Sequence, residues 1–121
     1  MPRDSFQDLV QEALGLIPAG FQPYLENVEV LVEDWPDPAL LEEMEVPVGE
    51  SLYGVFLGHP LTEGGTLPGE LPGRIHIFRG PLQEDFPDPE DLRREVAITV
   101  VHELAHHFGI GEERLEELGW G

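Results

Sequence analysis

No cysteine occurs among the 121 residues, so the chain forms no disulfide and offers no thiolate to a metal ion. The sequence also lacks an apolar run long enough to span a membrane. Its first residues include Asp4 and Asp8 and lack the apolar core of a signal peptide. These absences predict a cytoplasmic protein with no membrane partner.

Basic residues are scarce as well. Six lysines and arginines stand against 25 aspartates and glutamates, which gives a formal net charge of −19. A surface this acidic repels phosphate groups, so we expect neither nucleic acid nor an anionic membrane as a partner. The same charge keeps the protein in solution and favours cationic peptides.

The length suits one domain with a modest core, and neither a repeat nor a linker divides residues 1–121. Residues 58–73 are rich in Gly, Pro and Thr and are predicted as a loop, in which His59 is expected at the surface rather than at a metal. Apolar periodicity predicts the following helices and strands: an amphipathic helix at 4–15, strands at 27–33, 51–57 and 74–79, one or two helical turns at 39–44, and a short final helix at 112–118.

The chemistry is concentrated in a His-Glu-x-x-His motif at residues 102–106. On a helix, His102 and His106 lie one turn apart on the same face, so both imidazoles can bind one metal ion. Glu103 follows the first histidine, where its carboxylate can reach a metal-bound water. The motif therefore predicts a zinc hydrolase with two histidine ligands, a third protein ligand and an open position for water.

Such a motif would arise by chance in roughly 3 % of sequences with this composition, so its context matters. Asp88 and Pro89 are typical of a helix start, and Gly109 is typical of a helix end. Between them an apolar stripe recurs at helical spacing, and Glu95, Thr99, His102 and His106 form another stripe. The motif therefore lies in the last turns of a largely buried helix.

The third ligand must come from outside this helix. Glu112 completes the pattern His-Glu-x-x-His-x-x-Gly-x-x-Glu, a frame in which metzincins place their last ligand. We predict that Glu112 is the third ligand, with Glu113 as its close competitor. Helical geometry points His107 away from the other two histidines, so we interpret it as a buried or supporting residue rather than a ligand.

The run from Thr99 to Gly109, with Glu113-Arg114-Leu115 and Leu118-Gly119-Trp120 after it, closely resembles the small bacterial zincin-like metallopeptidases. Residues 52–58 and 74–82 also resemble that family, in which the usual residue at the position of Glu112 is Asp. The resemblance implies an α+β, minimal zincin-like fold, in which a small mixed or antiparallel sheet packs against an N-terminal helix and a C-terminal active-site helix. It also implies Zn²⁺ and a peptide or protein substrate.

Two functions follow from these observations. The first is a zinc-dependent metallopeptidase that hydrolyses peptide bonds with a metal-activated water and Glu103 as general base. The alternative is a catalytically weak or inactive metal-binding or interaction module that retains the zincin frame. The intact Glu103 favours the first, because a structural metal site needs no base. For the peptidase we further predict that residues 74–79 form the edge strand that pairs with substrate, and that Tyr53 or His76 stabilises the oxyanion.

Overall fold

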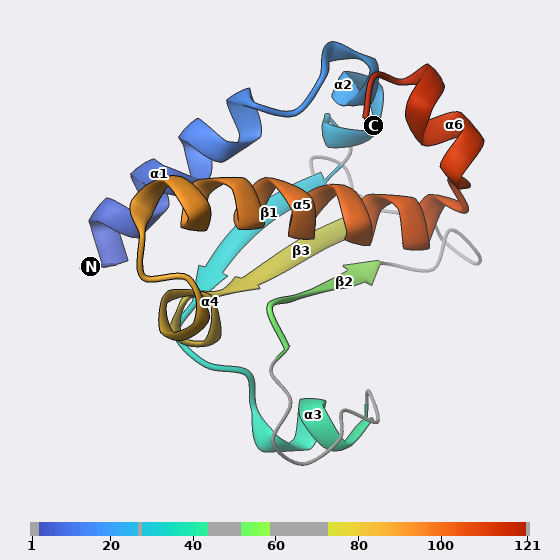
Figure 1. The fold of residues 1–121 in the computed structure, drawn as a ribbon. Coiled ribbons are helices and arrows are strands. Elements are labelled where there is room, and N and C mark those ends of the chain that lie inside the picture. The colour runs from blue at the N-terminus through green and yellow to red at the C-terminus, as the bar shows by residue number, and fades with distance from the viewer. Residues whose placement is uncertain (1–2, 27, 44–51, 59–72, 121) are drawn as a thin grey trace.

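The structure is a computed structural model that describes residues 3–26, 28–43, 52–58 and 73–120. It confirms the predicted α+β, zincin-like fold (Figure 1). Residues 59–72 of the predicted loop, which include His59, lie outside the described residues. The elements in chain order are α1 (Arg3–Gly15), η1 (Ala19–Phe21), α2 (Gln22–Leu25), β1 (Val28–Glu33), α3 (Pro38–Glu43), β2 (Gly54–Gly58), β3 (Gly73–Phe78), α4 (Arg79–Asp85), α5 (Pro89–Phe108) and α6 (Glu112–Glu117).

The three strands form a mixed sheet in the order β1-β3-β2. β1 pairs with β3 in parallel, and β2 pairs with β3 antiparallel. β3 is therefore the central strand, and the prediction that it is an edge strand is wrong. The alternation of β3 indicates that Ile75 and Ile77 are buried, which they are, but a burial pattern carries no information on strand order.

α5 crosses the sheet, and α1 packs beside it (Figure 1). Side chains from both helices meet the inward face of β3 and form one hydrophobic core. Burial of these side chains supplies the main favourable free energy of folding. The fully or almost fully buried members include Phe6, Leu9, Val10 and Ala13 of α1, Ile75 and Ile77 of β3, and Leu92, Val96, Val100, Val101 and Leu104 of α5. Within the described ranges, no helix combines the length and the apolarity needed to cross a membrane.

α5 begins and ends where its capping residues predict. The Asp88 side chain accepts a hydrogen bond from the Glu90 N–H at 2.9 Å, and Pro89 occupies the first turn. At the other end Gly109 has φ 66°, a left-handed conformation that glycine adopts without strain. The N–H of Ile110 then donates to the Ala105 carbonyl at 2.8 Å. A capped, buried helix therefore gives the motif a rigid support.

α4 is not predicted by the sequence pattern, which extends the preceding strand to residue 79. Pro81 lies in the first turn of this helix, where its missing N–H is tolerated. Leu82 is fully buried and fixes the helix to the core. The ring of Trp35 lies against Gly80, where an added Cβ would be 2.3 Å from Trp35 Cε2. Tertiary packing on Leu82 and Trp35 thus determines a helix that local propensity does not indicate.

Candidate metal centre

His102, Glu103 and His106 lie along the cleft between α5 and the outer edge of β2, which is open in that it pairs with no other strand among the residues that the structure describes. His106 and Glu103 line a hollow of about 220 Å³ together with residues of β2. His102 and Glu103 line a second hollow of about 350 Å³, to which Glu95 and Thr99 also contribute. Both imidazoles are exposed, and Glu103 lies between the two hollows. The polar stripe that the sequence indicates on this helix therefore faces one cleft.

The carboxylate of Glu103 reaches the open edge of the sheet. The Phe78 N–H donates to the Tyr53 carbonyl at 2.9 Å, and bonded and non-bonded pairs alternate along an antiparallel ladder. The backbone groups of Gly54 and Phe56 therefore point away from β3. The Phe56 N–H donates a hydrogen bond to Glu103. Glu103 thus meets the edge where an added strand would find its backbone partners.

Burial raises the pKa of Glu103 above its ordinary value of 4.5, because desolvation disfavours the charged carboxylate. The positive charges available on His102 and His106, together with the hydrogen bond from the Phe56 N–H, act in the opposite direction. Burial is the largest of these effects. A carboxyl with a raised pKa is better suited to both accepting and donating a proton near neutral pH.

The chemistry of these donors fits part of a zinc site. Imidazole nitrogens spaced i, i+4 on a helix suit two of the ligands. Among the residues that the structure describes, no group of three or more His, Asp or Glu side chains lies close enough to hold an ion together. Glu112 and Glu113 are exposed in the first turn of α6. Assignment of Glu112 as third ligand, with Glu113 as competitor, therefore stays a prediction.

Packing contacts fix the position of α6, on which Glu112 lies. The backbone of Leu118 packs so closely on Gly20 that a Cβ there would lie 2.5 Å from the Leu118 carbonyl oxygen. The rings of Phe21 and Trp120 meet edge to face with centroids 6.3 Å apart. These contacts hold α6 against the segment that follows α1. The chain between α5 and α6 is short, so they also set where Glu112 begins the helix.

His107 is exposed and lies at the cleft, so the prediction that it is buried is wrong, whereas its alternative role as a supporting residue rather than a ligand stays a prediction. Its ring is exposed and stacks on the ring of Phe56, with centroids 3.7 Å apart and planes at 16°. It also lines the smaller hollow with His106 and Glu103. Helical spacing places it about 100° from His106 but does not reveal that an aromatic residue of β2 faces it.

Of the two predicted oxyanion donors, Tyr53 lies at the site. It lines the larger hollow with His102 and Glu103, and its hydroxyl donates to Asp85. His76 is instead bound to the β1 residue Glu33, with 2.6 Å between Nδ1 and Oε1, and lines neither hollow. The hydrogen bond to Asp85, then burial and the charges of Asp85 and Glu95, raise the pKa of Tyr53 to about 12.

We expect the Asp85→Asn variant to lower the pKa of Tyr53 from about 12 toward its ordinary value of 10. The substitution removes a carboxylate that binds the phenol and repels the phenolate. Because the folded pKa lies above the unfolded one, this contribution to stability is present below pH 10 and is lost as the pH rises toward 12. Spectrophotometric titration of tyrosinate checks the shift. Tyr53→Phe identifies its signal, and an unchanged titration in Asp85→Asn contradicts the assignment.

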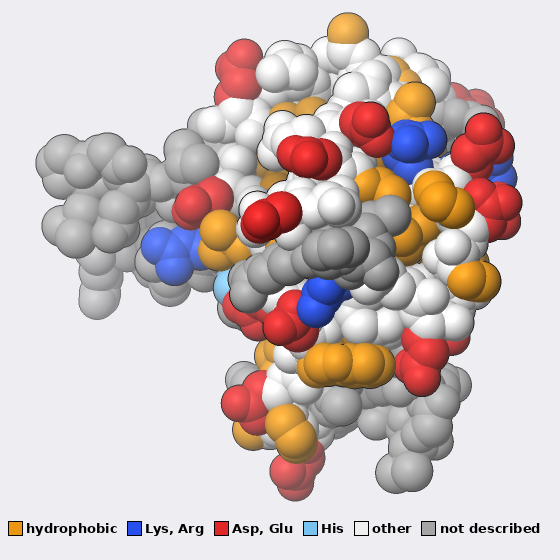
Figure 2. Space-filling view, turned by 90° about the vertical axis from the view of Figure 1, so that its left-hand side faces the viewer, with side chains coloured by type: hydrophobic (Ala, Val, Ile, Leu, Met, Phe, Trp, Pro, Cys, Tyr) orange, Lys and Arg blue, Asp and Glu red, His pale blue; other side chains and the backbone are white. Residues whose placement is uncertain are grey.

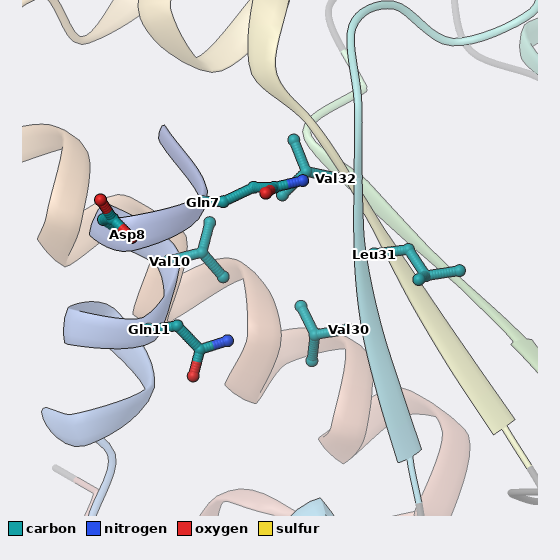
Figure 3. Close-up of a pocket in the computed structure, with 7 residues that line it drawn as sticks. All are labelled: Gln7, Asp8, Val10, Gln11, Val30, Leu31 and Val32. Atoms are coloured by element: carbon teal, nitrogen blue, oxygen red, sulfur yellow. The ribbon is translucent and has the colours of Figure 1, made fainter. Parts of the chain in front are cut away.

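A separate hollow of about 360 Å³ lies between α1 and β1 (Figure 3). The side chains of Gln7, Val10 and Gln11 point toward the strand there. Its other lining residues are Asp8, Val30, Leu31 and Val32. Although it is as large as the hollows beside Glu103, it contains one carboxylate and no histidine. It therefore lacks the donor set that metal-dependent hydrolysis requires.

The protein as a whole is acidic, with a formal net charge of −19. On the face shown in Figure 2, Asp and Glu side chains are spread over the surface with few arginines among them. Ion pairs with neighbouring carboxylates engage most arginines: Arg74 with Glu29, Arg79 with Asp34, Arg93 with Glu12, Arg94 with Asp91, and Arg114 with Glu117. The acids left over create a field that attracts cations.

Comparison with known proteins agrees with this geometry. A family model described as zincin-like metallopeptidase matches residues 25–120. Among solved structures, a conserved hypothetical protein from Thermo thermophilus is similar, with a TM-score of 0.60 and 27 % sequence identity. The alignment covers 89 % of this chain and 94 % of that one. No curated protein sequence matches.

Proposed function

The chain belongs to the zincin-like metallopeptidase family, and we propose that it is a zinc-dependent peptidase with Glu103 as its general base. One observation carries the proposal. Glu103 lies between the hollows that contain His102 and His106, and its carboxylate reaches the open edge of β2. A base, two metal-binding imidazoles and a strand edge that can pair with a peptide thus share one cleft.

His102 and His106 would hold the zinc ion, with Glu112 as the predicted third ligand. When bound, zinc supplies a Lewis acid and an activated water. Glu103 accepts a proton from the attacking water and passes it to the leaving amine. Its half-buried position supports both steps, because a carboxyl with a raised pKa returns the proton more readily. Tyr53 lines the same cleft, and its hydroxyl would donate to the developing oxyanion after releasing Asp85.

The substrate would be a peptide or protein segment that pairs with the open edge of β2. The outward N–H and carbonyl of Gly54 and the outward carbonyl of Phe56 would provide its hydrogen-bond partners, because the Phe56 N–H is donated to Glu103. Because the Phe56 N–H binds Glu103, the scissile bond of a paired peptide lies beside the base. The net charge of −19 favours substrates with cationic residues outside the paired segment.

Zinc retention tests the first part of this proposal. We expect purified wild-type protein to bind zinc and His102→Ala to bind it more than about 100-fold more weakly. Removing a residue that only hydrogen-bonds to a metal ligand already costs about 10–100-fold in metal affinity, and loss of the ligand itself should cost more. His107→Ala is the matched control and should retain zinc. Glu112→Ala should weaken binding more than Glu113→Ala. Elemental analysis and competition with a chelator measure all four variants. Equally little zinc in wild type and His102→Ala would contradict the proposal.

A metal-binding module without efficient proteolysis is the second candidate. The observation that favours it is that Glu112 is exposed on α6 and that the described residues contain no group of three side chains that could hold an ion. A broad peptide library separates the candidates. Cleavage that stops with a chelator and returns with zinc supports the peptidase, whereas tight zinc binding without any cleavage supports the module.

A further inference from the structure

We propose that His107 and Phe56 form the wall of a subsite that selects an aromatic or large aliphatic side chain next to the cleaved bond. This inference rests on the proposed peptidase function and adds the substrate class. It concerns a histidine that the metal-binding pattern leaves unused. The two hollows beside Glu103 differ in volume and in their lining residues.

The two hollows lie one after the other along the edge of β2. The larger one contains Tyr53 and residues of the middle of α5, from Glu95 to Glu103. The smaller one contains Phe56 and the end of α5, with His106 and His107. Glu103 borders both. A peptide paired with this edge would therefore have one hollow on each side of its scissile bond, which lies beside Glu103.

The smaller hollow has an apolar lining. The side chains of Leu52 and Phe56 contribute one side together with the backbone of Gly54 and Val55, and the imidazoles of His106 and His107 contribute the other. Among the described residues that line it, Glu103 has the only carboxylate, which the proposed reaction uses. Its volume of about 220 Å³ is below the roughly 300–1,000 Å³ of sites for drug-sized ligands, so it fits a single side chain.

Neighbouring groups hold the aromatic wall in place before any substrate binds. The Phe56 ring covers the Cα of Gly73, where an added Cβ would lie 2.2 Å from Phe56 Cζ. It stacks on His107 at 3.7 Å, and Phe108 meets both rings nearly at right angles, at 6.1 Å and 5.0 Å. Stacked and edge-to-face contacts are the geometries that aromatic rings prefer, so a further ring can join this cluster.

The larger hollow also has apolar groups in its lining, from Leu52, Tyr53 and Ile98, but it contains a second carboxylate. Glu95 joins Glu103 there, with the hydroxyl groups of Tyr53 and Thr99. An aromatic guest gains less there, because it would desolvate carboxylate and hydroxyl groups without pairing them. The preference for aromatic or large aliphatic residues should therefore appear at one of the two positions that flank the cleaved bond.

The experiment uses zinc-loaded full-length protein and peptides in which both flanking positions vary. In wild type we expect Phe, Tyr, Trp and Leu to be favoured over Ser at one flanking position. His107→Ala should reduce the ratio of kcat/KM for the Phe and Ser peptides about tenfold, because it opens one wall of the pocket. His107→Phe restores a stacking ring without imidazole nitrogens and should restore the ratio. His107 is exposed, so thermal unfolding should show both variants to be folded.

Binding provides a second readout that needs no turnover. We expect labelled peptides to bind Glu103→Gln, measured by fluorescence anisotropy, more tightly with Phe than with Ser at the selected position. The added His107→Ala substitution should remove this difference. Cleavage in wild type with the same residue preference in His107→Ala overturns the subsite but leaves the peptidase intact. Preferential binding that depends on His107, without cleavage by wild type, rejects the peptidase and retains the pocket. The absence of both overturns both.

Discussion

Replacing Glu103 with glutamine is expected to reduce kcat/KM by about 10²–10⁴-fold, the usual contribution of a general base. Glutamine has nearly the same shape, and its carbonyl oxygen can still accept the hydrogen bond from the Phe56 N–H. It cannot accept a proton from water at neutral pH. The loss should therefore be in kcat, with bound zinc unchanged. Steady-state kinetics on a cleaved library peptide and elemental analysis of the same samples measure both quantities.

The same variant should be at least as stable as the wild type when both are free of metal. Burial raises the pKa of Glu103, so the folded state favours the protonated carboxyl more than the unfolded state does. As the pH rises above the unfolded value through the folded pKa, the charged carboxylate becomes a growing cost to the folded state. At neutral pH the wild type bears this cost and the neutral glutamine does not. Thermal unfolding at pH 7 and pH 4 should show the gain only at pH 7.

Glu90→Gln is the matched control for charge. Glu90 is exposed in the first turn of the same helix and lines neither hollow beside Glu103. Its replacement should leave kcat/KM unchanged and lower stability slightly, because a carboxylate near a helix N-terminus is stabilising. Equal kinetic losses in the two variants, or full activity in Glu103→Gln, would exclude Glu103 as the base.

Much of the site could be predicted because one helix contains most of it. The caps at Asp88 and Gly109 depend on local backbone chemistry, so the helix begins and ends where the sequence predicts. Helical periodicity then places His102 and His106 on one face and Leu104 on another. Spacing along a single rigid element is the most reliable information that a sequence contains about geometry.

The contributions of other elements could not be predicted in the same way. The alternation of β3 indicates which of its residues are buried, but the same alternation fits a central or an edge strand. The stacking of His107 on Phe56 depends on that strand order, because β2 rather than β3 lies next to the end of α5. Placement of Glu112 depends on how Leu118 and Trp120 pack against residues about 100 positions earlier. Contacts between distant segments leave no local pattern.

The largest loss of stability is expected from Leu104→Ala, which shortens a core side chain between His102 and His106 on α5. Leu104 is fully buried in the core, directly after Glu103. Leu104→Ala removes its contacts and leaves a cavity, which lowers the free energy of unfolding by about 2–5 kcal/mol. Globular domains have only about 5–15 kcal/mol in total, so the variant should unfold at a much lower temperature or denaturant concentration. Urea titration with wild type and variant measures the difference.

Leu16→Ala makes the same chemical change at a side chain that is 55 % exposed, and it should alter the free energy of unfolding by about 0.5 kcal/mol or less. Leu104 faces the core while His102 and His106 face the cleft, and the caps of α5 lie several residues away. Below its unfolding transition, Leu104→Ala should therefore keep zinc and most of its kcat. Equal losses in the two leucine variants would place Leu104 outside the core. A loss of zinc in folded Leu104→Ala would instead mean that core packing, rather than the helix backbone alone, sets the positions of the two imidazoles.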